Sequence, residues 1–298
     1  MFSITEHPFL VPFDNSFELA KMKTSFDDLN KKSHYKKIYK SNRQKLYETQ
    51  QKLYAHNKYS VLFIFQAMDA AGKDSTIRHV FRGVNPAGFQ VSSFKQPSKR
   101  ELDHDFLWRT AKELPQRGKI GIFNRSYYEE TLVVRVHPEY LQSQQLPFDY
   151  KAKLTSSDSK GEPDFWQQRF RSINDHEHHL ASNGTVIRKF FLNVSREEQH
   201  RRFKDRIDRP EKNWKFSASD LKESQLWDKY MEAYQDCLRS TSTPWAPWYC
   251  IPADNKPAMR ATVSEIVLQT LKNLDIEYPQ LDDDTTAKLQ NFRSQLII

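Results

Sequence analysis

Residues 59–75 read YSVLFIFQAMDAAGKDS, and this stretch decides the fold class. Residues 59–65 form a short run of β-branched and aromatic side chains, which is typical of a strand buried on both faces. Small residues follow at once, and the stretch from Asp74 to Arg82 has the composition of a helix. A buried strand, a turn of small residues and a helix together predict a phosphate-binding P-loop.

The turn departs from the general P-loop pattern G-x-x-x-x-G-K-S/T at two positions. Gly72 and Lys73 occupy the expected final positions, but Ala67 replaces the first glycine. Asp74 stands where the hydroxyl residue belongs, and Ser75 follows it. An ordinary strand–turn–helix connection, with Asp74 as a helix cap, is the alternative interpretation. The residues predicted to surround phosphate are Ala70, Ala71, Gly72, Lys73, Asp74 and Ser75.

Asp69 is an unusual residue inside a turn that binds anions. A carboxylate there is unfavourable unless a cation or a specific donor accompanies it. Its presence therefore predicts magnesium, held between Asp69 and phosphate oxygens. Asp74 offers a second carboxylate at the position where a hydroxyl usually meets the metal.

Four further runs of apolar residues predict strands, at residues 89–94, 119–123, 185–194 and 248–251. Helical segments are expected between and after them, at residues 101–114, 164–181, 197–206 and 263–274. Strands that alternate with helices predict a five-stranded parallel sheet covered on both faces. We expect one core at residues 59–274, a helical arm at 1–58, an exposed loop at 143–163 and an acidic tail or helix at 275–298.

The charge is unevenly distributed along the chain. The net charge is +8, and residues 21–58 carry eleven Lys/Arg against three Asp/Glu. Such a surplus suits an anionic polymer, either nucleic acid or polyphosphate, although solvated helix faces are the simpler interpretation. No apolar run approaches the roughly 20 residues of a membrane span, and no secretory signal is evident. Two cysteines, Cys237 and Cys250, fit a cytoplasmic enzyme with reduced thiols.

A second group of polar residues follows the predicted strand at 119–123. Because ligands bind at the carboxyl ends of parallel strands, Asn124 and Arg125 should face the same site as Lys73. The guanidinium of Arg125 can contact phosphate oxygens with a fork of donors. A structural ion pair is its alternative role.

These segments together resemble the polyphosphate kinase 2 family, in particular the class III members that accept nucleoside monophosphates and diphosphates. The matching stretches are FQAMDAAGKD at 65–74, GVNP at 83–86, SFKQPS at 93–98, LDHDFLWR at 102–109, GIFNRSYYE at 121–129, RVHP at 135–138, KNWKFS at 212–217 and APWY at 246–249. Their order and their spread over most of residues 60–252 make the resemblance specific. It implies an α/β P-loop kinase fold with three α/β/α layers, and a helical lid near residues 196–230.

The resemblance also implies an activity and its participants. Polyphosphate would donate a terminal phosphoryl group to AMP or ADP, reversibly and by direct in-line transfer, with Mg²⁺ or in its place Mn²⁺. Adenine nucleotides, and guanine nucleotides as a further option, would be acceptors; no nucleic acid or membrane would take part. Homodimers or homotetramers are common in the family.

The resemblance assigns roles to individual residues. Many members have aspartate where this chain has Asn124, so Asp69 would carry more of the metal site, helped by Asp74 or Glu129. Lid arginines would close over the phosphates, and Arg202 and Arg206 share a helix face at i, i+4 spacing. The implied catalytic residues are Asp69, Lys73, Arg125, Arg202 and Arg206. The implied phosphate and nucleotide ligands include Lys95, Asn124, Arg125, Arg209, Lys212 and Lys215.

Two rival functions remain open from the sequence. An ATP-dependent nucleotide kinase of the thymidylate type would share the turn but would need no basic surface for a polymeric donor. A basic nucleic-acid-binding protein would bind in a salt-sensitive manner and would not need Asp69. The histidines around Glu177 do not form H-E-x-x-H, so an exposed helix face is the preferred interpretation there.

Overall fold

A five-stranded parallel sheet forms the centre of the computed structural model, which describes residues 2–27, 30–149, 154, 164–214 and 217–296. The strand order is β2-β3-β1-β4-β5, and every neighbouring pair is parallel. The prediction of a five-stranded parallel sheet is therefore confirmed. The strands are β1 (Ser60–Gln66), β2 (Phe89–Ser93), β3 (Ile120–Asn124), β4 (Thr185–Asn193) and β5 (Trp248–Pro252).

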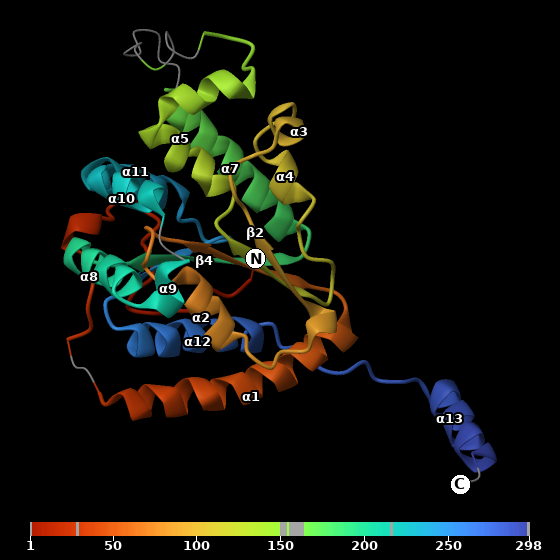
Figure 1. The fold of residues 1–298 in the computed structure, drawn as a ribbon. Helices are drawn as coiled ribbons and strands as arrows, with labels where there is room; N and C mark the ends of the chain where they lie inside the picture. Colours follow the sequence, from red (N-terminus) through yellow and green to blue (C-terminus); the bar gives the residue numbers. More distant parts are fainter. Residues whose placement is uncertain (1, 28–29, 150–153, 155–163, 215–216, 297–298) are drawn as a thin grey trace.

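Helices cover both faces of the sheet, which gives the three layers of Figure 1. One layer contains α1 (Lys32–His56), α2 (Lys73–Val80) and α12 (Lys256–Lys272). The opposite layer contains α5 (Val133–Val136), α7 (Phe165–Ser182) and α11 (Trp227–Thr241). Strand β1 is buried along its whole length, as expected for a parallel strand between two helical layers.

Short helices make up most of the remaining structure. Outside the segment predicted as a lid they are η1 (Leu19–Lys21), η2 (Pro86–Gly88), α3 (Lys99–Leu102), α4 (Trp108–Ala111), η3 (Tyr127–Glu130) and η4 (Pro138–Gln144). The segment predicted as a lid contains α8 (Arg196–Ile207), α9 (Pro210–Asn213) and α10 (Ala218–Gln225). The acidic C-terminal segment forms α13 (Asp283–Gln295), which projects away from the three layers (Figure 1).

Three predicted helices have different bounds in the structure. The stretch at 101–114 is broken into α3 and α4, because the carboxylate of Asp105 accepts a bond from the Leu107 amide in a local turn. The last core helix begins at Lys256, because Pro257 is tolerated in a first helical turn and Asn255 caps it. Among the described residues 16–27 and 30–31, η1 is the only helix, so the long helix of the predicted arm is α1.

Other sequence-based expectations meet the structure only partly. Most of the loop expected at 143–163 lies outside the described residues. Cys237 and Cys250 are buried and unbonded to each other. Among the helices that the structure describes, none is long and apolar enough to cross a membrane.

Candidate active site

The turn between β1 and α2 has the backbone of a phosphate-binding loop. Ala70 and Gly72 adopt positive φ angles of 62° and 109°, which glycine accepts freely and alanine only with strain. Helix α2 begins at Lys73, so its first amides have no partner within the helix. The Lys73 ammonium is buried and donates to the Ala67 carbonyl at 2.7 Å. Burial, and then the positive charge of Arg125, lower the pKa of Lys73. An anion bound in the turn would stabilise the charged ammonium.

Arg202 holds this turn through hydrogen bonds to its carbonyls, whereas the sequence analysis placed this residue on the phosphates. Its Nη1 donates to the carbonyls of Ala70 and Ala71 at 3.0 and 2.6 Å. Its Nη2 donates to the carbonyls of Ala253 and Asp254 at 2.6 and 3.1 Å, and its Nε donates to Glu198 at 2.7 Å. A guanidinium has five N–H donors, and here they all point at protein oxygens. The i, i+4 spacing with Arg206 is real, but Arg202 faces the inside of the fold.

Arg125 lies opposite the turn and holds two carboxylates. It follows β3 with a positive φ of 63°, a strained backbone of the kind that collects at functional sites. Its Nη2 donates to Asp69 at 3.0 Å, and its Nη1 donates to Glu129 at 3.4 Å. Burial raises the pKa of Glu129, while Arg125 and Lys73 lower it. Asp69, Lys73, Arg125 and Glu129 therefore form one charged cluster, as the sequence predicted for the first three.

Asp74 belongs to a separate pair. Its carboxylate accepts from the Asn124 amide at 2.7 Å. Among the described residues no three His, Cys, Asp or Glu side chains form a group that could hold a metal ion. The expected set of Asp69, Asp74 and Glu129 is thus not assembled, because Arg125 engages two of the carboxylates and Asn124 the third. Asp69 and Asp74 still fit a magnesium ion, which usually takes only one or two protein carboxylates beside phosphate oxygens and water.

Ser75 does not face the expected phosphate position. Its hydroxyl donates to the Gly72 carbonyl at 2.9 Å and accepts from Arg260 at 3.1 Å. Each helical residue turns the side-chain direction by about 100°, so the shift from position 74 to 75 moves this hydroxyl off the phosphate side. Its predicted contact with phosphate is therefore not supported.

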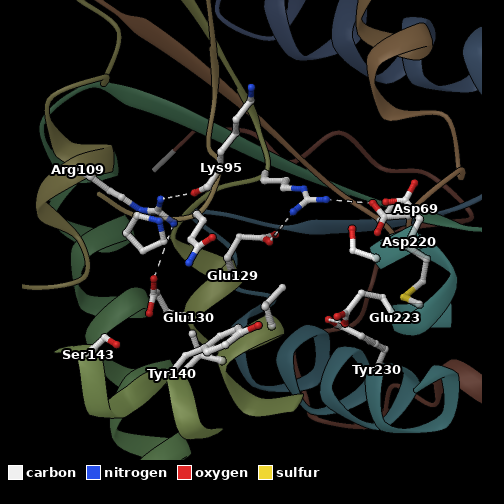
Figure 2. A pocket seen from close by; sticks show the side chains of 18 of the residues that line it. Asp69, Lys95, Arg109, Glu129, Glu130, Tyr140, Ser143, Asp220, Glu223 and Tyr230 are labelled. Atoms are coloured by element: carbon white, nitrogen blue, oxygen red, sulfur yellow. Dashed lines mark hydrogen bonds and ion pairs between the residues drawn. The ribbon is translucent and has the colours of Figure 1, made fainter. Parts of the chain in front are cut away.

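A cavity of about 370 Å³ opens beside the charged cluster (Figure 2). The loop after β2 and α4 supply Lys95 and Arg109, which Figure 2 shows together on one side. Asp69 and Asp220 lie on the opposite side, above Glu223 and Tyr230. The remaining charged and aromatic lining residues include Arg125, Glu129, Glu130, Tyr140 and Tyr234.

Sequence reasoning missed most of the residues that line this cavity. Arg109 donates to the Lys95 carbonyl at 2.7 Å, and its buried Nε has no partner among the described residues. Arg109 lies in the LDHDFLWR stretch at 102–109, and that stretch is the only part of the sequence that pointed to Arg109. Asp220 and Glu223 come from α10, where nothing in the local sequence marks them. Burial, and then Asp69, raise the pKa of Asp220.

The other basic residues of the predicted lid have different surroundings. Arg206 donates to Asp220 at 3.0 Å, so it stands at the edge of the cavity. Arg209 and Lys212 share the carboxylate of Asp205 at 2.7 and 2.5 Å, and neither lines the cavity. Lys215 lies outside the described residues.

Comparisons with known proteins assign the chain to a family. The family model described as "Polyphosphate kinase 2 (PPK2)" matches residues 29–153 and 158–279. The chain belongs to the polyphosphate kinase 2 family. This membership confirms the resemblance and the P-loop kinase fold, and it makes the protein a kinase.

Two relatives and one solved structure of this family are especially similar. An "ADP-polyphosphate phosphotransferase" from Rhodopseudomonas palustris is 50% identical over 94% of each chain. An "AMP/ADP-polyphosphate phosphotransferase" from Meiothermus ruber is 46% identical over 79% of this chain and 80% of its own. The crystal structure of polyphosphate kinase 2 from Arthrobacter aurescens TC1 matches with a TM-score of 0.82 and 34% identity, and covers 94% of this chain and 93% of its own.

Proposed function

We propose that this polyphosphate kinase 2 transfers the terminal phosphoryl group of inorganic polyphosphate directly to AMP or ADP. One observation carries the proposal: Asp69 of the P-loop and the guanidinium of Arg125 line a cavity of about 370 Å³, and both interact with the buried P-loop lysine Lys73. A donor phosphate in the turn would therefore meet an acceptor phosphate in the cavity. The relatives named for AMP and ADP support this choice of acceptors.

The charged cluster can neutralise a phosphoryl group in transit. Phosphoryl transfer depends mainly on positioning and on stabilising charge. The Lys73 ammonium would leave the Ala67 carbonyl and bind an oxygen of the donor phosphate. The Arg125 guanidinium would turn its N–H groups from Asp69 and Glu129 to the phosphoryl group being transferred. Arg206 would approach from Asp220 when the α8–α10 segment closes as a lid. No residue needs to be phosphorylated.

A divalent cation, Mg²⁺ with Mn²⁺ as a substitute, is part of the proposal. Asp69 and Asp74 would hold it, and Glu129 would stay with Arg125. Bound there, the cation would neutralise charge on the phosphate oxygens. The Asp74–Asn124 pair orients one of the two carboxylates before the cation arrives.

The cavity offers the acceptor nucleotide a cationic and an apolar side. Lys95 and Arg109 are placed to bind the acceptor's phosphate, since arginine matches phosphate geometry with several donors. Tyr140, Tyr230 and Tyr234 supply aromatic surface for the base. We also propose that guanine nucleotides are accepted and that the protein assembles into homodimers or homotetramers.

A donor and acceptor assay tests the function. Purified protein receives Mg²⁺, either polyphosphate or ATP as donor, and either AMP or ADP as acceptor, and the nucleotides are separated over time. The proposal expects ATP from polyphosphate with both acceptors. Transfer to AMP from ATP alone would instead identify a nucleotide kinase of the thymidylate type.

A further inference from the structure

A fully buried polar cluster adjoins the segment that follows Arg125, and the proposed function makes no use of it. Its centre is Glu177 of α7, whose carboxylate accepts from the Lys189 ammonium of β4 at 2.6 Å, with both side chains 0% exposed. Glu177 was expected on an exposed helix face, and this expectation is wrong. It shares one face of α7 with the buried Phe170 and Ile173, at helical spacing, and this face packs on β4.

Two tyrosine hydroxyls complete this Glu177 cluster, which consists of Tyr127, Tyr128, Glu177 and Lys189. Both hydroxyls donate to the same carboxylate oxygen, Oε1 of Glu177, at 2.8 and 2.9 Å. Besides Glu177, the Lys189 ammonium donates to the Tyr128 hydroxyl and to the Thr241 carbonyl, each at 2.7 Å. An ammonium has three donors, so each of them has an acceptor. In the described part of the chain, none of the four cluster residues lines the cavity.

The position of the two tyrosines is the property that this cluster fixes. Burial raises the pKa of Glu177 and lowers the pKa of Lys189, and the attraction between the two charges opposes both changes. A buried ion pair loses much of its attraction to the cost of dehydration, so apolar side chains of similar volume are often as stable. Apolar side chains could not hold two hydroxyls at one carboxylate oxygen, whereas Glu177 does so.

The two tyrosines stand between Arg125 and Glu129, two members of the charged cluster beside the P-loop. The backbone of Arg125 has a positive φ of 63°, and such a strained conformation persists only where the surrounding structure holds it. On one side, the Arg125 amide donates to a carbonyl of β1 at 3.0 Å. On the other side, the chain enters η3, where the bonds of Tyr127 and Tyr128 to Glu177 hold the first turn. The Arg125 backbone is therefore held from both sides.

We propose that Glu177 is a positioning residue for phosphoryl transfer, and that it acts on Arg125 through Tyr127 and Tyr128. The inference rests on the proposed function, because it depends on the role given there to Arg125. Lys189 neutralises the buried carboxylate and keeps it beside the two hydroxyls. The guanidinium of Arg125 thereby keeps its place opposite the P-loop. A displacement of about 1 Å in a group that orients reactants can lower a rate by roughly a hundredfold.

Removal of the two hydroxyls tests the proposal. The variant carries Tyr127→Phe and Tyr128→Phe, which keep both rings and the ion pair, and Tyr127→Phe alone is a milder form. The matched control is Tyr249→Phe, because the buried Tyr249 hydroxyl donates to the Thr5 carbonyl at 2.8 Å and does not line the cavity. Tm is measured for each protein, and kcat is measured well below it with saturating polyphosphate, AMP and Mg²⁺.

The double variant should lose activity while it remains folded. We expect its kcat to fall by about ten- to a hundredfold, with a smaller loss in Tyr127→Phe and the wild-type value in the control. An unchanged kcat in the double variant, or an equal loss in the control, would overturn the positioning role.

An Arg125→Lys background distinguishes positioning from a purely structural role. Lysine lacks the rigid fork of donors, so little remains in this background for Glu177 to position. Adding Tyr127→Phe and Tyr128→Phe to it should lower kcat by less than about twofold. The same fold loss as in the wild-type background would show that the hydroxyls act by another route, and it would overturn the proposal.

Hydrogen exchange separates this inference from the proposed function. The exchange of amides in residues 124–130 is followed by mass spectrometry in each protein, without substrate. We expect faster exchange there in the double variant than in the wild type and the control. If no protein shows turnover, the proposed function fails, and faster exchange would still show that Glu177 holds this segment. Unchanged exchange would overturn the inference in either case.

Discussion

Replacement of Arg202 by lysine should loosen the P-loop while preserving the charge. Arg202 directs five N–H donors at five protein oxygens, and two of these belong to the turn residues Ala70 and Ala71. Lysine has three donors on one nitrogen, so at least two of the oxygens lose their partner. The Arg202 side chain is only 4% exposed, and water therefore cannot take over these bonds without opening the fold.

The structure sets the size of the effect. A buried acceptor without a partner costs about 1–3 kcal/mol, so Arg202→Lys should lower the free energy of unfolding by about 2–6 kcal/mol. For a domain of this size each kcal/mol lowers Tm by roughly 2–3 °C, which predicts a decrease of about 4–18 °C. Because the loosened carbonyls lie in the turn, KM for polyphosphate should rise as well.

Thermal unfolding and steady-state kinetics with polyphosphate and AMP test this reasoning together. Arg201→Lys is the matched control, since Arg201 is the exposed neighbour that also pairs with Glu198; its Tm and KM should stay at the wild-type values. If Arg202 acted on the reacting phosphates instead, Arg202→Lys would lower kcat by about a hundredfold or more at an unchanged Tm. That result would refute its supporting role.

Three further predictions concern the charged groups around the turn. Lys73→Ala and Asp69→Asn should each lower kcat by about 10²–10³-fold or more. The control Asp236→Asn, which breaks an ion pair on α11, should leave kcat unchanged. Circular dichroism should show all three variants folded, and activity kept in either site variant would contradict the assignment. KM for polyphosphate should rise as pH increases through about 8, because burial lowers the pKa of Lys256, beside Gly72 of the turn, to about 8 and polyphosphate binds the charged form. Lys256→Arg should flatten this pH profile. An equally steep profile in that variant would show that Lys256 is not the cause. Asn124→Asp replaces an amide that now donates to Asp74 at 2.7 Å with a second carboxylate, so Mg²⁺ should raise the Tm of this variant by more than that of the wild type. An equal shift would place the cation elsewhere.

The sequence predicted the features that depend on local patterns. Buried strands are recognisable as runs of β-branched and aromatic residues. The predicted ends of the five strands therefore lie within one or two residues of the observed ends. The small residues before Lys73 identified the P-loop, and the end of β3 brought Arg125 to it by the general rule for parallel sheets. Asp69 meets Arg125 at 3.0 Å, as two segments at the same sheet edge should.

The features that depend on tertiary packing escaped prediction. Helical spacing puts Arg202 and Arg206 on one face of α8. It does not show that Arg202 contacts the P-loop carbonyl of Ala70 or that Arg206 contacts Asp220. Asp220 and Glu223 lie on a polar helix without a distinctive sequence pattern. Their position in the cavity lining therefore could not be predicted from the sequence. The surplus of charge in residues 21–58 was evident, whereas the gathering of Lys37, Lys40 and Arg43 with Arg82 around one groove depends on how α1 packs in the fold.

The fate of a labelled phosphate tests the central claim most directly. Polyphosphate with radiolabelled phosphates is mixed with AMP, Mg²⁺ and excess protein, and the reaction is quenched within one turnover. The account predicts label in the β position of ADP within that turnover and none on the denatured protein. In reactions left to run for further turnovers it predicts label in the γ position of ATP. Label that stays bound to the protein, or that reaches nucleotide only after ATP is added, would contradict direct transfer from polyphosphate at the Lys73 and Arg125 site.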